Sequence, residues 1–342
     1  MAALWPKRHN HRVTTVGQLG EFPLIARIAT TVDDACLDTP TAGGFSLKLG
    51  IGDDAAAWSI PYGVELATTD TIVEGVHFTR ETIPWADLGW KLWVANVSDV
   101  ISMGGTPLVG IVTLGLPSDL DIAAIDALYA GMINACRHYR TLIAGGDIVR
   151  SRDVFASVTL NGVCEAEPLR RDGACAGHAI GVTGPLGGSG GGLRVLHDGL
   201  AANDALFSAH RRPRPRVASG TALRKAGVTT AMDVSDGLVA DLAKMCHASG
   251  VGATLFAPKV PVAPALRESF NEKESLLLAL GGGEDYEIVF TGDPAAVQRS
   301  VAAIDGAAVI GEITNDRRRR VSVLDASGVE MTISKTGWEH FG

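Results

Sequence analysis

The sequence predicts an α/β protein, with α+β character, that is divided into two domains. Strand-like apolar runs alternate with helical patterns throughout the chain, which is typical of this class. At 342 residues the chain also exceeds the length at which one hydrophobic core usually splits. A polar, turn-rich stretch at residues 165–177 precedes a new strand pattern. We therefore expect an N-terminal domain at residues 1–164 and a C-terminal domain at residues 165–342.

The individual elements follow from short apolar runs for strands and from i, i+3 and i+4 apolar spacing for helices. In the first domain we expect strands near Val64–Thr69, Leu108–Leu116, Thr141–Ala144 and Phe155–Val163, and helices near Pro84–Met103 and Ile122–Tyr139. In the second domain we expect strands near Ala179–Thr183, Tyr286–Thr291 and Ala307–Ile310, and helices near Gly190–Asp198, Pro215–Lys225, Leu238–Ser249 and Pro294–Ala303. No long period repeats, which argues against a solenoid.

Composition indicates a cytoplasmic protein that does not enter a membrane. Hydrophobic residues make up 46% and charged residues 20% of the chain, and no apolar run approaches the roughly 18 residues that a membrane span needs. The basic start of the chain lacks the apolar segment of a signal peptide, so we interpret it as a loose extension. The five cysteines are scattered and have no C-x-x-C spacing, which favours reduced thiols.

Charge argues against nucleic acid as a partner. The net charge is −8, whereas broad nucleic-acid binding rests on clustered lysine and arginine. Two basic runs, residues 210–216 and 317–320, are interpreted as solvated loop and turn faces, with phosphate steering as the alternative.

Aspartates adjoin glycine, serine or threonine in six places, at the expected ends of strands or helices. The six segments are Gly52-Asp53-Asp54, Thr68-Thr69-Asp70, Val97-Ser98-Asp99, Gly145-Gly146-Asp147, Asp233-Val234-Ser235-Asp236-Gly237 and Gly283-Glu284-Asp285. Each segment alone is typical of a turn or a helix N-cap, and Asp236 is a candidate for such a cap. Asp99 differs, because it lies inside an expected helix and shares a largely apolar face with Leu92, Asn96 and Met103. A buried carboxylate needs a partner.

Few basic residues lie near these six segments in the sequence, which favours a cation as the shared partner. Oxygen ligands suit Mg²⁺ or Ca²⁺ rather than zinc, and no calcium-loop pattern is present. Like charges about 4 Å apart repel by roughly 1 to 4 kcal/mol, so a polyphosphate among these aspartates would need divalent ions. The glycine-rich residues 184–192 either offer backbone N–H groups to an anion or form a flexible loop. The pattern therefore favours Mg²⁺ together with phosphate.

In their order along the chain, these motifs resemble the thiamine-monophosphate kinase family. The motifs are GIGDDAA (50–56), TDTIVEGVHF (69–78), NVSDVISMGGTP (96–107), GGD (145–147), DVSDGL (233–238) and GGEDYE (282–287). The resemblance implies the two-domain fold of the aminoimidazole ribonucleotide synthetase superfamily, with an N-terminal mixed sheet and helices and a C-terminal α/β domain. It also implies a homodimer paired through the N-terminal domains. The implied activity is ATP-dependent phosphorylation of thiamine monophosphate to thiamine diphosphate, the final step in making that compound.

The resemblance assigns roles to individual residues. A Mg²⁺ cluster would be held by Asp54, Thr68, Thr69, Asp70, Asp99, Asp147, Asp233 and Asp236. ATP would contact Tyr129, Gly146, Asp147, Arg171 and Ser235, and thiamine monophosphate would contact His77, Glu284 and Trp338. An aromatic face and a carboxylate suit a cationic thiazolium ring. Without the resemblance, Trp338 would be interpreted as packing the C-terminal tail and His77 as a core histidine.

The implied chemistry is direct transfer, with the acceptor phosphate attacking the γ-phosphorus of ATP in line. The acceptor oxygen is ionised at neutral pH, so neither a protein nucleophile nor a general base is needed. Catalysis would then depend on metal ions held by Asp70, Asp99 and Asp236. Two alternatives stay open. One is a synthetase of the same superfamily that activates a carbonyl oxygen or selenide, and the other is a non-catalytic scaffold that binds divalent ions or nucleotides.

Overall fold

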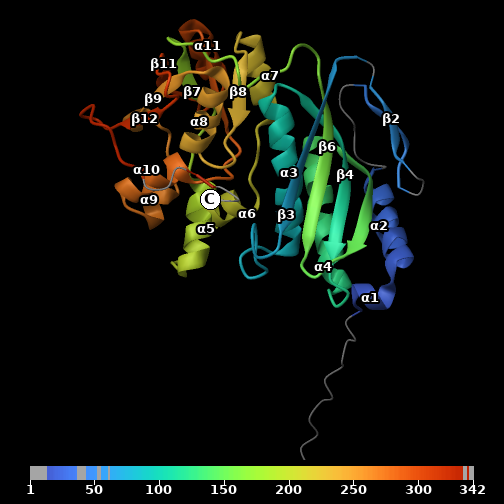
Figure 1. Cartoon of the computed structure of the whole chain (residues 1–342). Coiled ribbons are helices and arrows are strands. Elements are labelled where there is room, and N and C mark those ends of the chain that lie inside the picture. The colour runs from blue at the N-terminus through green and yellow to red at the C-terminus, as the bar shows by residue number, and fades with distance from the viewer. Residues whose placement is uncertain (1–13, 37–43, 52–54, 61, 334–336, 339–342) are drawn as a thin grey trace, which may run out of the picture.

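Two β-sheets, one from each half of the chain, organise the structure (Figure 1). The computed structural model describes residues 14–36, 44–51, 55–60, 62–333 and 337–338. Helices and strands are mixed along the whole of this described chain, so the expected α/β class is confirmed. No helix in these ranges is long and apolar enough to cross a membrane.

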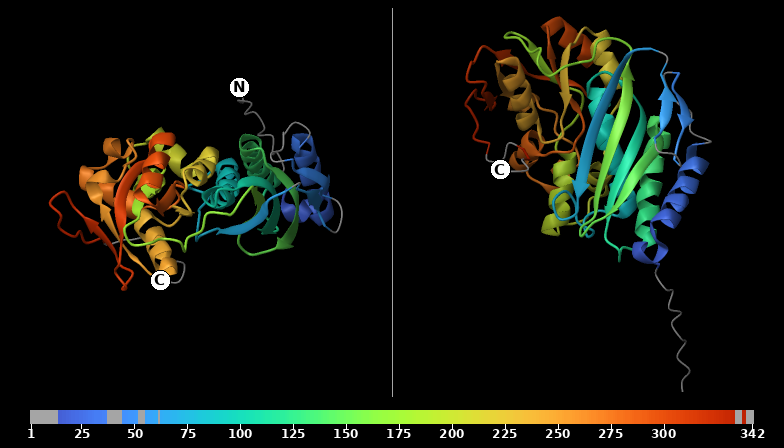
Figure 2. Two further views of the ribbon diagram at one scale, coloured as in Figure 1. Left: turned by 90° about the horizontal axis from the view of Figure 1, so that it is seen from above. Right: turned by 45° about the vertical axis from the view of Figure 1, so that its right-hand side comes forward.

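The first half forms a four-stranded mixed sheet in the order β3-β6-β4-β5. Only β4 and β5 pair in parallel. The strands are β3 (Val64–Val73), β4 (Thr106–Leu116), β5 (Leu142–Arg150) and β6 (Phe155–Cys164). Helices α2 (Glu21–Cys36), α3 (Trp85–Ser102) and α4 (Ile122–Tyr139) lie on one side of this sheet (Figure 2, left). The other face, called the open face, is free of helices in the described chain, although around Val109 and Leu142 it packs against Leu47 and Trp58. All four strands and both helices expected for this half are confirmed.

Several elements at the start of the chain were not predicted. They are α1 (Val16–Leu19), α2, and the small sheet of β1 (Ser46–Leu49) and β2 (Ala57–Ser59). Helix α2 buries Leu24, Ile28 and Val32 at four-residue spacing, which is the pattern of a one-sided helix.

The second half forms a six-stranded sheet in the order β12-β9-β11-β7-β10-β8. Its strands are β7 (Ala179–Val182), β8 (Thr230–Asp233), β9 (Gly252–Phe256), β10 (Ile288–Gly292), β11 (Ala308–Thr314) and β12 (Val321–Leu324). Its helices are α5 (Gly188–Asp198), α6 (Asp204–Arg211), α7 (Val217–Lys225), α8 (Leu238–Ser249), α9 (Leu266–Ser269), α10 (Glu272–Gly281) and α11 (Pro294–Ala303), with a 3₁₀ turn at Ala257–Lys259. Every expected element of this half is present, whereas β8, β9, β12, α6, α9 and α10 were not predicted.

The two halves share a hydrophobic core, and α3 lies between them. The largest buried cluster continues from α3 and α4 into α7, β10 and α11. We therefore keep the division between residues 164 and 165 as a proposal about chain organisation.

The interpretation of residues 210–216 as a solvated run was wrong. His210 is 5% exposed, and Pro213 O accepts a hydrogen bond from the buried Trp90 Nε1 at 2.8 Å. Arg212 pairs with Asp87, and its guanidinium lies over the Trp90 ring. The run packs against α3 because its charges find partners there. Residues 317–320, in contrast, are exposed as expected.

Helices α3 and α4 approach each other closely at two glycines, Gly89 and Gly131. The close approach leads to a prediction about stability. A Cβ atom on Gly131 would lie 1.8 Å from Ala86 O, so a side chain there must push the helices apart. We expect Gly131→Val to lower the free energy of unfolding by about 1 to 3 kcal/mol or more, measured by chemical denaturation. The control is Ala130→Val, because Ala130 is exposed on the same helix. Equal losses in the two variants would contradict the close approach as the cause.

Candidate active site

A pocket of about 790 Å³ lies where the two halves meet. Four carboxylates line one part of it, from Asp70, Asp99, Asp233 and Asp236. Another part is lined by His77, Glu284 and Trp338, and a third by residues of α5 and α10. The pocket thus joins a strongly acidic region to a mixed polar and apolar one.

Strand β3 and helix α3 supply the first two carboxylates. Because side chains alternate along a strand, Thr68 and Asp70 both face the helix layer. The Asp70 backbone N–H donates to Asn96 Oδ1 at 3.0 Å, and Thr68 Oγ1 donates to Asp99 Oδ2 at 2.5 Å. Burial raises the pKa of Asp70 to about 6, and the charges of Asp99 and Asp236 contribute. Burial also raises the pKa of Asp99, against the Thr68 hydrogen bond and the charge of Arg171.

The other two carboxylates come from the last residue of strand β8, Asp233, and from the loop after it, Asp236. Asp233 is 6% exposed and accepts a hydrogen bond from Ser98 Oγ at 2.8 Å. Burial, and next the charge of Asp99, raises the pKa of Asp233 well above its ordinary range. Asp236 accepts a hydrogen bond from Lys244 Nζ. It is not the helix cap considered from sequence, because Gly237 holds that position without a side-chain bond.

A fully buried aspartate that sequence reasoning missed shapes the loop around Asp236. Asp241 Oδ2 accepts hydrogen bonds from the backbone N–H groups of Ser235, Asp236 and Gly237 at 3.0, 3.0 and 3.1 Å. Its Oδ1 accepts from Lys244 Nζ at 2.7 Å. The available clue was an aspartate on the first turn of an apolar helix, where a carboxylate can bind free N–H groups.

The donor set suits a hard divalent cation. Besides burial, the charges of Asp99 and Asp236 raise the pKa of Asp70, and those of Asp99 and Asp70 raise the pKa of Asp233, so these carboxylates interact electrostatically across the pocket. Mg²⁺ takes such oxygen ligands. In the described part of the chain, however, no three His, Cys, Asp or Glu side chains are arranged as a ready-made metal-binding group.

The residues assigned to thiamine monophosphate all line the pocket. His77 Nδ1 accepts a hydrogen bond from the Val73 backbone N–H at 3.1 Å. Glu284 Oε2 accepts one from Lys91 Nζ at 2.6 Å. Trp338 is 45% exposed, and its backbone N–H donates to Asp236 O at 3.2 Å. His77 and Trp338 are both partly accessible in the pocket wall, so neither is a core side chain.

Two of the proposed metal ligands, Thr69 and Asp147, lie on the face of the sheet opposite the pocket carboxylate Asp70. Strand register aligns Thr71, Ser157, Thr113 and Asp147 in one row, so Asp147 shares the open face of the sheet with Thr69. Two strands separate β3 from β5, which corresponds to about 14 Å between Asp70 and Asp147. One Mg²⁺ ion with bonds of about 2 Å cannot contact both within one chain. Asp54 lies outside the described residues.

The residues assigned to ATP are also dispersed. Ser235 lines the pocket, and Arg171 is close enough to Asp99 to oppose the rise of its pKa. Gly146 lies on β5, where a Cβ atom would be 1.9 Å from Val112 O. Tyr129 is buried on α4 beside a second, smaller cavity of about 280 Å³ that is also lined by Arg27 and Thr31. Burial raises the pKa of Tyr129.

The glycine-rich residues 184–192 use their backbone N–H groups internally. Asp285 accepts hydrogen bonds from Gly187 N at 2.5 Å and from Ser189 N at 3.0 Å, at the start of α5. An internal carboxylate therefore takes the place that an external anion would occupy, and much of the segment is helical rather than a flexible loop.

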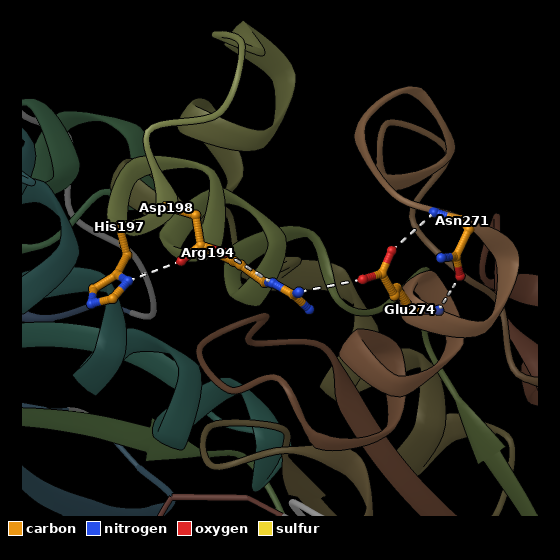
Figure 3. A network of polar contacts seen from close by, with 5 residues as sticks. All are labelled: Arg194, His197, Asp198, Asn271 and Glu274. Atoms are coloured by element: carbon orange, nitrogen blue, oxygen red, sulfur yellow. Dashed lines mark hydrogen bonds and ion pairs between the residues drawn. The ribbon is translucent and has the colours of Figure 1, made fainter.

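A chain of polar contacts joins α5 to α10 along the far part of the pocket (Figure 3). Arg194 lies 3.3 Å from both Asp198 and Glu274, and His197 Nδ1 lies 3.0 Å from Asp198 Oδ1. Glu274 in turn completes the capping box of α10 with Asn271. These contacts connect α5 with α10, and both helices line the pocket. Helix α10 was not predicted from the sequence.

Comparisons with known proteins agree with this architecture. Residues 52–164 match the family "AIR synthase related protein, N-terminal domain", and residues 176–324 match its C-terminal domain. Thiamine-monophosphate kinase of Escherichia coli (strain K12) is 35% identical over 337 residues, which cover 94% of this chain and 98% of the relative.

Solved structures of thiamine-monophosphate kinases are also similar to this chain. Thiamine-monophosphate kinase from Stenotrophomonas maltophilia K279a has a TM-score of 0.75 and 34% identity, over 89% of this chain and 96% of that one. A structure described as AaThiL complexed with AMPPCP and TMP has a TM-score of 0.73 and 33% identity, over 96% of this chain and 100% of that one.

Fold and site together define a two-domain AIR synthase related protein with an acidic pocket between its halves. Within that class, the chain belongs to the thiamine-monophosphate kinase family. The family resemblance and the fold expected from sequence are thereby confirmed.

Asp285 generates a prediction about pH and stability. Its pKa is raised from 3.8 to about 7, chiefly by burial of the carboxyl group. The folded state therefore binds the Asp285 proton more tightly than the unfolded state does. This proton binding stabilises the folded state at low pH, and the stabilisation is lost as the pH rises from about 4 through about 7. We expect the unfolding free energy of the unaltered protein to fall relative to Asp285→Asn over that window, measured by urea denaturation at several pH values. If the unfolding free energies of the two proteins changed in parallel with pH, the raised pKa of Asp285 would be contradicted.

Proposed function

We propose that this protein transfers the γ-phosphoryl group of ATP to thiamine monophosphate, giving thiamine diphosphate and ADP. The observation that carries the proposal is the pocket in which four carboxylates lie beside His77, Glu284 and Trp338. Relatives named thiamine-monophosphate kinase, and a similar structure described with AMPPCP and TMP, support the same substrates. The reaction would be the final step of thiamine diphosphate synthesis.

In this proposal Asp70, Asp99, Asp233 and Asp236 would hold Mg²⁺ on the pocket side, and Thr68 would contribute its hydroxyl group. Bound Mg²⁺ would neutralise the charge of the phosphate groups. The chain's own contribution is placement of the ligands. Asn96 holds the backbone of Asp70, Ser98 orients Asp233, and Asp241 fixes the loop that carries Asp236.

Substrate placement completes the mechanism. Glu284 and Trp338 offer a carboxylate and an aromatic face to the cationic thiazolium. An acceptor phosphate directed toward Asp70 and Asp99 would then attack the γ-phosphorus in line. Because the attacking oxygen already carries negative charge, no side chain has to remove a proton.

The open face of the four-stranded sheet supports two further parts of the proposal. Thr69, Asp147 and Gly146 belong to strands that reach this face, so their contacts with metal or ATP would be made away from the pocket described above. Helices cover only the opposite face, which is consistent with a homodimer paired through the N-terminal halves (Figure 2).

The proposal is tested by incubating purified protein with ATP, Mg²⁺ and thiamine monophosphate, and separating the thiamine phosphates by chromatography. Thiamine diphosphate should form, excess EDTA should abolish its formation, and added Mg²⁺ should restore it. Failure to form it, with ATP consumed when another acceptor is supplied, would favour a synthetase of the same superfamily. No turnover with any acceptor would favour a binding scaffold.

The pocket carboxylates are expected to be essential for turnover. Asp70→Asn, Asp99→Asn and Asp236→Asn should each lower kcat by about a hundredfold or more, because each removes a negative charge proposed to hold metal. Steady-state kinetics measures the effect, and circular dichroism checks the fold. Asp305→Asn is the control, since Asp305 is exposed and outside the pocket. Near-normal kcat in all three pocket variants would refute the metal-based mechanism.

A further inference from the structure

Lys91 carries a buried ammonium group directly behind the pocket wall. The residue is 7% exposed and does not itself line the pocket. Burial of a lysine is costly unless its charge is paired. Its Nζ donates to Glu284 Oε2 at 2.6 Å, which links α3 of the first half to a loop of the second.

A neutral histidine completes the surroundings of Lys91. His210 Nδ1 lies 3.4 Å from Lys91 Nζ and 3.2 Å from Ser189 Oγ. Burial lowers the pKa of His210 well below its ordinary value, and the positive charges of Lys91 and Arg211 lower it further. Because a lysine ammonium can only donate, the Nδ1 atom that faces it must accept. Lys91 is therefore held between Glu284 and His210.

Glu284 is constrained at its backbone as well as at its side chain. Its φ angle is 63°, in the left-handed region that few residues other than glycine adopt. Its backbone N–H donates to Ser235 O at 2.7 Å. Its side chain is 34% exposed and borders the pocket. A strained backbone and a buried cation thus fix one carboxylate at the pocket edge.

We propose that Lys91 is a positioning residue for the acceptor substrate, because it holds Glu284 where that carboxylate meets the cationic thiazolium ring. This inference rests on the proposed function. Lys91 precedes Asp99 by eight residues on α3, which corresponds to about 12 Å along the helix. The same helix therefore sets the spacing between the carboxylate that faces the thiazolium and a carboxylate proposed to hold metal.

The test separates the two substrates kinetically. Lys91→Met removes the charge and leaves a chain of similar length. It should raise KM for thiamine monophosphate by about tenfold or more, while KM for ATP changes by less than about twofold. Glu284→Gln should have a similar effect. The double variant should be no worse than Glu284→Gln alone, because Lys91 acts through Glu284.

Lys225→Met is the matched control, since Lys225 is exposed at the end of α7. Thermal midpoints are recorded for every variant, because a purely structural role would lower the midpoint without separating the two KM values. An unchanged KM for thiamine monophosphate, equal rises for both substrates, or additive effects in the double variant would overturn the proposal.

If Lys91→Met does not fold, Lys91→Gln, which retains an N–H donor, is measured in the same way. Failure of both variants to fold would assign Lys91 to stability alone and overturn the positioning role. The proposed function fails separately, when the unaltered protein forms no thiamine diphosphate.

Discussion

The burial of helix α3 between the two halves is the constraint on which the site depends. Nearly every residue from Leu88 to Ser102 is buried, so polar groups on this helix must find partners inside the protein. The partners come from other elements: Lys91 with Glu284, Ser98 with Asp233, and Asp99 with Thr68. Glu284 and Asp233 line the pocket, and Thr68 lies two residues from Asp70. The packing that stabilises the helix therefore also places the polar side chains of the site.

The aspartates divide into two physical kinds. Asp241 and Asp285 accept hydrogen bonds from backbone N–H groups and so build loops. Asp70 and Asp233 instead line the pocket, where burial and next the charge of Asp99 raise their pKa values. Repulsion between carboxylates does not stabilise the fold. Carboxylates grouped in this way are therefore expected at a binding site for positive charge. Sequence spacing alone does not separate the two kinds, because both adjoin glycine or serine.

Much of the fold was predictable, and the failures have identifiable causes. Helix α3 was expected at Pro84–Met103 and is observed at Trp85–Ser102, because its apolar spacing is regular. Helix α10 was missed because Leu276, Leu277 and Leu278 are consecutive and show no helical period. Lys91 was overlooked although a lone lysine in the apolar run LGWKLWVAN is itself a sign of an internal partner. Which partner it finds depends on tertiary packing, which no local pattern contains.

Strand alternation gives the adjacent residues Thr69 and Asp70 different surroundings. Asp70 faces α3 and the pocket, whereas Thr69 faces the open side of the sheet, where its hydroxyl contacts Val158 O and Ser157 Oγ. The two-residue period of a strand is enough to place these neighbours on opposite faces of the sheet. Under the proposed function, the phosphate groups that react must therefore meet the carboxylates on the helix side. Asp147 lies on the open side, with two strands between it and Asp70, so under the same proposal it would contact a different part of the bound substrates.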